Sequence, residues 1–405
     1  MKFEYFVAQR LVKSKEKNYV KPIVRIAVIS IALSITVMLV SLSVLQGFKN
    51  EIKNKIAGFG SHIQIVQYGG NSLEGNNTVK LSQKEISSIK NIPQIKSLSG
   101  VYVRSGAIIN NDDFLGVIVK GIGKDYNKDF FKNNLSEGEI IQHGKERNQD
   151  ILVSKTIADK LHLKIGDKVK VYFYVNNSYR AKNFSVCGIY DTGLAEYDER
   201  FMICDINVLH NVFSAEENDY TSYEIMLKNF ALLNPISEQI YYSTDSDKTI
   251  ISITDFEPNL FAWLNLLDNN VIMIVVIMML ICIVTLSSVV LIMIFEKKTM
   301  IGILKSLGAN NIAIIKIFIY RIGYIAAKGI LYGNVLAISL LAIQKYTHII
   351  SLDKESYYLS YAPVSINIWY FIITDILTLV ICLLCLTIPT RSISKISLSQ
   401  TIKKN

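Results

Sequence analysis

The chain lacks the residue patterns of an enzyme with its own energy source or metal centre. The pattern G-x-x-x-x-G-K-[ST], which would form a loop around nucleotide phosphates, does not occur, and neither does H-E-x-x-H. The five histidines stand apart without metal-ligand spacing, and no nucleophile elbow or paired-carboxylate pattern is present. The sequence therefore predicts no catalytic residue, no metal and no cofactor, so any work must be powered by another subunit.

Charged residues are scarce in four long apolar runs, which cover residues 23–45, 271–295, 322–343 and 366–388. Each run is long enough to cross a hydrocarbon core of about 30 Å at about 1.5 Å per residue. Arg25 lies at the start of the first run, and Arg321, Lys328 and Asp375 lie next to or within the later runs. These residues do not form the chain of acidic groups expected of a proton relay. Two interpretations of Lys328 stay open: a pair with Asp375, or an ammonium that reaches the membrane surface.

Negative charge is concentrated between the first two runs. Residues 48–268 hold 24 basic and 28 acidic residues, a net charge of −4. The rest of the chain carries a net charge of +13, and the two sum to the chain's net charge of +9. The basic residues therefore surround the apolar runs, which argues against a nucleic-acid partner. By the positive-inside rule both termini and the 296–311 loop are predicted to be cytoplasmic, and residues 48–268 to lie outside.

These patterns predict an α-helical membrane protein with four transmembrane helices and a large α+β domain between the first and second. We expect a cytoplasmic interfacial helix at 1–22, spans at 23–47, 269–295, 312–343 and 366–389, a periplasmic domain at 48–268, a cytoplasmic coupling helix at 296–311, a periplasmic loop at 344–365 and a cytoplasmic tail at 390–405.

Within residues 48–268, short β-branched and aromatic stretches alternate with amphipathic ones. Strands are predicted at 63–67, 101–109, 114–121, 169–175, 184–190 and 222–227, and helices at 82–89, 154–162, 206–213 and 231–241. The stretch 175–179 reads as a hairpin tip, and the glycine-containing stretch 69–77 as a mobile loop. Cys187 and Cys204 either pair or serve as buried strand residues.

The loop between the second and third spans is predicted to be a short amphipathic helix. Ile301, Leu304 and Leu307 recur at three-residue intervals with lysines on other faces, and Gly308 is placed to end the helix. A rigid helix between two spans can dock in a partner's groove and pass motion into the membrane, or it can be an ordinary interfacial connector. In the third span, Gly329 and Gly333 form a GxxxG pattern, which predicts close helix packing and subunit association.

Several of these segments resemble one family of transporters. The loop 296–309 is similar to the coupling segment of the FtsX-like/MacB-type ABC transporter permeases, and Pro389 to Lys403 resembles that family's ending. Ser43 to Phe48, the glycine–aspartate pair at 166–167, residues 188–198 and residues 352–364 further resemble the lipoprotein-releasing (LolC/LolE) branch. These matches span essentially the whole chain, in order.

The resemblance implies the permease subunit of an ATP-driven complex that takes lipoproteins from the outer leaflet of the bacterial inner membrane toward a periplasmic carrier. Its implied partners are a cytoplasmic ABC ATPase, a second permease copy or paralogue, the lipoprotein and membrane lipids. Coupling to the ATPase would use Glu296, Lys298, Ile301, Gly302, Leu304, Lys305, Leu307 and Gly308. Lipid-substrate contact would use Leu42, Leu45, Phe48, Ile272, Met273 and Val276.

Two rival functions share most of these features. One is a MacB-type efflux permease, and the other is an FtsX-type mechanotransmission regulator of a cell-wall hydrolase. The 188–198 segment and the length of the outer domain favour lipoprotein release over the regulator. The hairpin at 175–182 is shorter than the carrier-recruiting hook of the LolC type, which leaves direct carrier docking there open.

Overall fold

The computed structural model describes residues 20–70, 77–110, 113–143 and 149–384, and its chain forms two compact units. The first unit holds Met1–Lys49, Trp263–Ser351 and Tyr361–Asn405, and the second holds Asn50–Ala262 and Leu352–Ser360. The segment Leu352–Ser360, which the sequence placed in a separate loop, is thus part of the second unit. The chain therefore passes between the two units at four points.

Some predicted segments lie outside the described residues. These are nearly all of the interfacial helix at 1–22, the tail at 390–405, the last residues of the span at 366–389 and most of the loop at 69–77.

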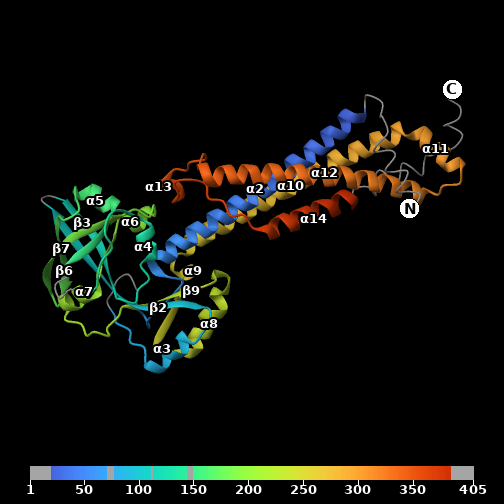
Figure 1. Ribbon diagram of the computed structural model, residues 1–405. Helices are drawn as coiled ribbons and strands as arrows, with labels where there is room; N and C mark the ends of the chain where they lie inside the picture. Colours follow the sequence, from blue (N-terminus) through green and yellow to red (C-terminus); the bar gives the residue numbers. More distant parts are fainter. Residues whose placement is uncertain (1–19, 71–76, 111–112, 144–148, 385–405) are drawn as a thin grey trace. The chain divides into compact units, whose positions relative to one another are not determined.

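The first unit is a bundle of helices around an apolar core. It contains α2 (Val20–Gly60, as far as Lys49), α10 (Pro258–Glu296, from Trp263), α11 (Lys298–Ser306), α12 (Asn311–Thr347) and α14 (Ile368–Leu384). The four long helices run side by side (Figure 1). Their buried faces share one cluster, which includes Ile31, Ile35 and Leu39 of α2, Leu286 and Val290 of α10, Ile322 and Ile325 of α12, and Phe371 of α14.

Among the described residues, three helices are long and apolar enough to cross a membrane: α2 from Pro22, α10 and α12. The described part of α14 is apolar but covers 17 residues. The predicted fourth span therefore stays a prediction, because its last residues lie outside the described part of the chain.

The second unit is built on a mixed sheet whose strands follow the order β10-β1-β9-β2-β3-β8-β5-β7-β4, with β6 pairing with β2 and β7. Its strands are β1 (Ile63–Gln67), β2 (Ile95–Asn110), β3 (Asp113–Ile122), β4 (Leu135–Gly138), β5 (Asp150–Ser154), β6 (Lys168–Val175), β7 (Ser178–Tyr190), β8 (Phe201–Asp205), β9 (Ser222–Leu227) and β10 (Lys248–Ser252). The pairs β3–β8 and β5–β7 are parallel, and the others are antiparallel.

Short helices connect these strands. They are α3 (Gln83–Lys90), α4 (Asp129–Asn133), α5 (Lys155–Leu161), α6 (Ala195–Asp198), α7 (Ile206–Phe213), the 3-10 helix η1 (Phe230–Leu232), α8 (Leu233–Ser243), α9 (Ile253–Phe256) and α13 (Lys354–Tyr357). α5 and α7 contribute Ile157, Leu161 and Leu209 to a core that strands β3, β6 and β7 complete. Side-chain caps fix several starts, as where Ser154 accepts the amide of Ile157 at 3.0 Å.

The alternating and β-branched segments were predicted well. β1, β9 and α7 match the predicted ranges, and the hairpin tip is confirmed, since Val175 pairs with Ser178 across a turn of Asn176 and Asn177 with positive φ. Prediction missed β4, β5, β8 and β10. β5 and β8 are five-residue strands that are almost wholly buried, and such short apolar runs carry no period that distinguishes strand from helix.

Candidate functional site

The short helix α11, between α10 and α12, has a fixed end. It follows Lys297 and ends at Leu307, and Gly308 then adopts a φ of +88°. This left-handed conformation suits glycine and closes the helix end, where the amide of Ala309 bonds to the carbonyl of Leu304 at 2.9 Å. α11 is therefore a separate helix rather than the start of α12.

The structure exposes a different face of α11 from the one that the sequence predicted. Ile301 is fully buried in the helical core, and Gly302 is buried as well. Ile303 and Leu307 lie four residues apart on one face and expose 56% and 78% of their surface. The predicted docking face is thus wrong at Ile301, because a helix that packs against α12 must turn one apolar side inward. Of the remaining predicted coupling residues, Glu296 and Gly308 are exposed, whereas Lys298, Leu304 and Lys305 are half-buried.

The predicted lipid-contacting residues of α10 are exposed. Ile272, Met273 and Val276 expose 59%, 58% and 51% of their surface, and residues 269–295 contain no charged side chain. In water such a surface would be a liability, whereas in a membrane it faces acyl chains or another apolar helix. α10 therefore offers a continuous apolar surface that the rest of the described bundle leaves uncovered.

The predicted residues of α2 behave differently. Leu42 and Leu45 are half-buried, and Phe48 is almost fully buried. The ring of Phe48 lies edge-on against Trp263, with 5.6 Å between ring centroids. The prediction that Phe48 contacts lipid is therefore wrong in this structure, because α10 covers that side of α2.

The two glycines of the GxxxG pattern face the chain's own first span. A Cβ atom at Gly329 would lie 2.7 Å from Ile31, and one at Gly333 would lie 2.8 Å from Ile35. The hydroxyl of Thr36 also donates to the carbonyl of Gly333 at 3.1 Å. The pattern thus brings α12 against α2 within one chain, which corrects the expectation of an interface between subunits.

Gly333→Leu is expected to destabilise the single chain by about 1–3 kcal/mol, because the new side chain meets the Ala32 carbonyl and Ile35. Thermal unfolding of the detergent-purified chain measures this. Gly323→Leu on the same helix is the matched control, since a Cβ there meets nothing within 4 Å. Equal midpoints for the two variants would contradict the assigned contact.

The pair that the sequence left open between Lys328 and Asp375 is not formed. The carboxylate of Asp375 on α14 accepts from the side-chain amide of Asn334 on α12 at 2.8 Å. The ammonium of Lys328 lies over the ring of Tyr324 at 4.6 Å from its centroid, on an exposed face. Which residues of α12 and α14 meet depends on how the two helices pack, and spacing along the chain does not specify this.

In the second unit, a buried ion pair caps the end of α2. The ammonium of Lys120 donates to both carboxylate oxygens of Glu224, at 2.6 and 2.9 Å, and to the backbone carbonyl of Phe59. Both charged side chains are at most 3% exposed. Burial lowers the pKa of Lys120, and the Glu224 carboxylate offsets part of that effect. A cation suits the carbonyl end of a helix, so the pair holds the last turn of α2 in place.

Phe59 anchors the same turn in a cluster of rings. It stacks on Tyr197 at 4.8 Å between centroids and meets Phe130 and Phe131 edge-on at 5.3 and 5.7 Å. Phe130 lies so close to Gly58 that a Cβ there would collide with its ring. The end of α2 is therefore fixed by rings on one side and by a charge on the other.

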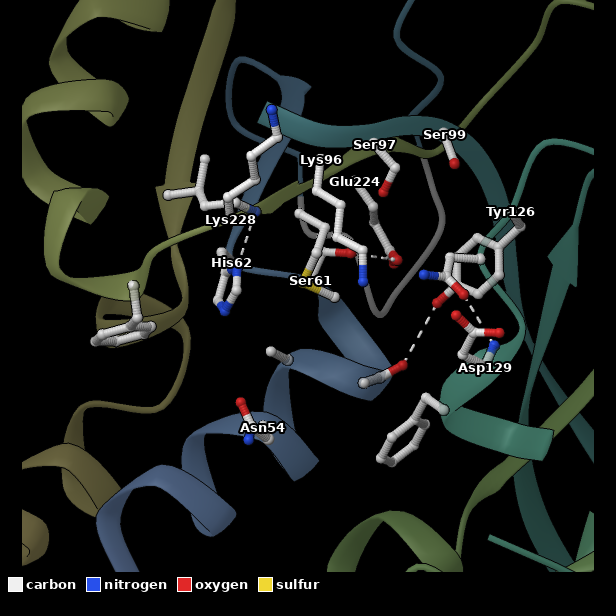
Figure 2. A pocket seen from close by; sticks show the side chains of 17 residues that line it. Asn54, Ser61, His62, Lys96, Ser97, Ser99, Tyr126, Asp129, Glu224 and Lys228 are labelled. Atoms are coloured by element: carbon white, nitrogen blue, oxygen red, sulfur yellow. Dashed lines mark hydrogen bonds between the residues drawn. The ribbon is translucent and has the colours of Figure 1, made fainter. Parts of the chain in front are cut away.

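A cavity of about 310 Å³ lies beside this turn (Figure 2). Its wall includes Asn54, Ser61 and His62 from the end of α2 and the residues that follow, with Lys96 and Glu224 from β2 and β9. The hydroxyl of Ser61 donates to Glu224 at 3.3 Å. The lining combines cations, carboxylates and hydroxyls, so it does not select one class of ligand.

His62 gives this unit a predictable response to pH. The amide of Leu227 donates to Nδ1 of His62 at 2.9 Å, and burial together with the charge of Lys96 lowers the pKa of His62 to about 4. Between pH 4 and 6.5 the unfolded chain therefore binds a proton that the folded chain does not. Stability from His62 is present above about pH 6.5 and falls, by at most about 3 kcal/mol, as the pH drops to 4.

His62→Asn is expected to remove this part of the pH dependence while keeping an acceptor for the Leu227 amide. Denaturant unfolding of the full chain at pH 6.5 and 4.5 gives the free energies. The difference between wild type and variant should shrink at the lower pH. A constant difference would mean that His62 does not titrate in this range.

Two family profiles together match most of the chain. The profile of the MacB-like periplasmic core domain matches residues 26–253, and the profile of the FtsX-like permease C-terminal region matches residues 272–398. The chain belongs to the FtsX-like permeases that carry a MacB-like periplasmic core domain. This confirms the family recognised from the 296–309 segment.

The permease is similar over nearly its whole length to curated lipoprotein-releasing system transmembrane proteins. It is 20% identical to LolC of Xylella fastidiosa strain 9a5c, covering 98% of each chain, and 22% identical to LolE of Haemophilus influenzae, covering 100% of each. It is 23% identical to LolC of Buchnera aphidicola from Schizaphis graminum, covering 80% of this chain and 79% of that one. The crystal structure of the periplasmic region of MacB from Actinobacillus actinomycetemcomitans aligns with a TM-score of 0.34 and 15% identity, covering 51% of this chain and 95% of that one.

Some site residues of the permease escaped the sequence prediction although a signal was present. Ile303 is one of them, and it lies four residues before the predicted Leu307, which is the spacing of a helix face. Lys120 and Glu224 each interrupt an otherwise apolar strand, which is the pattern of a buried ion pair. Cys187 and Cys204 are both free thiols, so they do not pair. Cys204 is a buried residue of β8, whereas Cys187 of β7 is half-buried.

Proposed function

We propose that this permease is the membrane subunit of an ATP-driven complex that releases lipoproteins from the outer leaflet of the inner membrane toward a periplasmic carrier. The exposed apolar surface of α10 carries the proposal, because a lipid-anchored substrate needs an uncharged path beside a span. Each buried CH₂ of an acyl chain is worth about 0.8 kcal/mol, so such a surface holds a lipid anchor without specific polar contacts. The names of the near-full-length relatives support the same function.

In this proposal the second unit is periplasmic, and both termini and α11 are cytoplasmic. The distribution of basic residues around the spans supports this orientation. The predicted boundaries at 1–22, 48–268, 344–365 and 390–405 are kept as part of the proposal, with residues 352–360 now grouped with the periplasmic unit. Residues 366–389 form the fourth span.

ATP hydrolysis comes from a separate cytoplasmic ABC ATPase that docks on α11, so the permease is not itself an enzyme. The exposed side chains of Ile303 and Leu307 are the apolar contacts available to it. A second permease copy or a paralogue completes the membrane part. The periplasmic carrier would approach the outer unit, where the hairpin tip exposes the paired rings of Tyr174 and Tyr179.

A photo-crosslinking residue at Met273 is expected to capture lipoprotein in the purified complex before ATP is added and to lose it once ATP binds. Crosslinkers at Leu45 and at Ile26 test the two ends of the first span predicted at 23–47. Ile26 is the control, since it is exposed but lies near the predicted cytoplasmic end. Capture at Ile26 equal to that at Met273, or capture that ATP leaves unchanged, would contradict lipoprotein release and favour an efflux or regulatory function.

A further inference from the structure

One eight-residue segment of the second unit, which we name the hub, contacts each part of the chain that leads toward the spans. The hub is Asp191 to Asp198, which follows β7 and includes α6. Chain leaves the second unit through α2, through α10 and at both ends of Leu352–Ser360. Side chains or carbonyls of the hub bond to α2, to Leu352–Ser360 and to Glu257, the residue before α10.

The first contact is with α2. The ammonium of Lys55 donates to the carbonyl of Thr192 at 2.5 Å, and the ring of Tyr197 stacks on Phe59. Lys55 also donates to the carbonyl of Tyr358 at 2.9 Å, so one cation joins α2, the hub and the 352–360 segment. Three segments far apart in sequence thus meet at a single charge.

The second contact is with Leu352–Ser360, which forms a closed loop. The amide of Leu352 donates to the carbonyl of Ser360 at 3.0 Å, and α13 lies between them. From α13, the ammonium of Lys354 pairs with the carboxylate of Asp191 at 2.5 Å. Gly193 leaves room for this, since a Cβ there would come within 3.1 Å of Lys354 and 3.2 Å of Lys55.

The third contact is with the residue before α10. The hydroxyl of Tyr197 donates to the carboxylate of Glu257 at 2.6 Å, and α10 begins at Pro258. The hub thus bonds to the residue that immediately precedes α10.

The hub is held together by its own hydrogen bonds and is joined to the sheet. The buried carboxylate of Asp198 accepts from the amides of Thr192 and Gly193, at 3.1 and 2.9 Å, and from the Thr192 hydroxyl at 2.7 Å. The carbonyl of Asp198 accepts from the hydroxyl of Ser154 at the end of β5. These bonds give the hub a fixed conformation between the three segments that it contacts.

We propose that the hub is the positioning element that makes the end of α2, the start of α10 and the 352–360 segment move together during transport. The proposal rests on the proposed function in one respect: an ATPase drives the spans. In this proposal the residues of the hub position other segments and do not contact the substrate. Asp191, Thr192 and Tyr197 act by holding Lys354, Lys55 and Glu257.

The test compares wild type with Asp191→Lys, with the swap of Asp191→Lys and Lys354→Asp, and with Tyr197→Phe, each in the full complex with its ATPase. Glu199→Lys is the matched control: it adds the same charge one residue beyond the hub, where Glu199 makes an exposed pair with Lys160 at 3.3 Å. Hydrogen exchange of the Thr192 and Gly193 amides is measured with and without ATP, alongside lipoprotein released per ATP hydrolysed.

In wild type, ATP is expected to change exchange at the hub amides. Asp191→Lys should abolish that change and lower release per ATP by about 10-fold, in the range typical of coupling between sites, and the swap should restore both. A purely structural role would lower thermal stability equally in all variants without altering the ATP response. If Asp191→Lys does not fold, Lys354→Met tests the same contact from the other side.

If ATP changes hydrogen exchange at the hub amides of Asp191→Lys or Lys354→Met as much as in wild type, the proposed role of the hub is wrong. Failure of the proposed function gives a different result: wild type would show the ATP response at the hub but release no lipoprotein.

Discussion

Leu307→Asp is expected to abolish transport while leaving the permease folded and inserted. Leu307 is 78% exposed at the end of α11, so the substitution costs the isolated chain little. In the complex, a carboxylate forced into an apolar docking contact costs about 3–5 kcal/mol, which corresponds to a loss of about 100-fold or more in productive docking. Co-purification of the ATPase and ATP-dependent release measure the effect, and Ile303→Asp should behave alike.

Leu307→Met is the matched control, because it keeps an apolar side chain of similar volume and should retain docking. Ile301→Asp separates docking from folding. Ile301 is fully buried in the helical core, so its replacement should lower the stability of the isolated chain as well. A Leu307→Asp complex that transports like wild type would show that this face of α11 is not the docking surface.

Lys120→Met is expected to lower the free energy of unfolding by about 3–5 kcal/mol, because it leaves the Glu224 carboxylate buried without its cation. The same change removes the donor to the Phe59 carbonyl at the end of α2. Denaturant unfolding of the full chain, followed by the fluorescence of the tyrosines in the second unit, gives the free energy of unfolding.

A second substitution distinguishes charge from packing. Glu224→Gln in the Lys120→Met background removes the unpaired charge and should recover most of the lost stability. Lys160→Met breaks an exposed pair with Glu199 and should change stability by less than about 0.5 kcal/mol. No recovery in the double variant would mean that the cap on α2, rather than the buried charge, dominates the loss.

Elements with a clear local signal were predictable from the sequence. The alternating residues of β6 and the amphipathic α7 gave their limits to within one residue, and Asn176 and Asn177 gave the hairpin turn. Buried five-residue strands such as β5 and β8 were missed, because their position in the sheet depends on partners far along the chain. The same holds for the candidate site. The sequence predicted that α11 is a helix, but it did not predict which side of α11 is exposed.

By itself the sequence determined the apolar spans, the acidic outer domain, the helix between the second and third spans and the family, since composition, charge and local periodicity are properties of short segments. Only the tertiary structure decided the neighbours. Gly333 packs against α2 rather than another subunit, and Ile301 rather than Ile303 is buried. Asp375 accepts a hydrogen bond from Asn334, and Lys55 and Lys354 both bond to the hub, which contains Tyr197. Each of these contacts joins residues that are far apart in the sequence, and local sequence patterns do not specify which distant surfaces pack together.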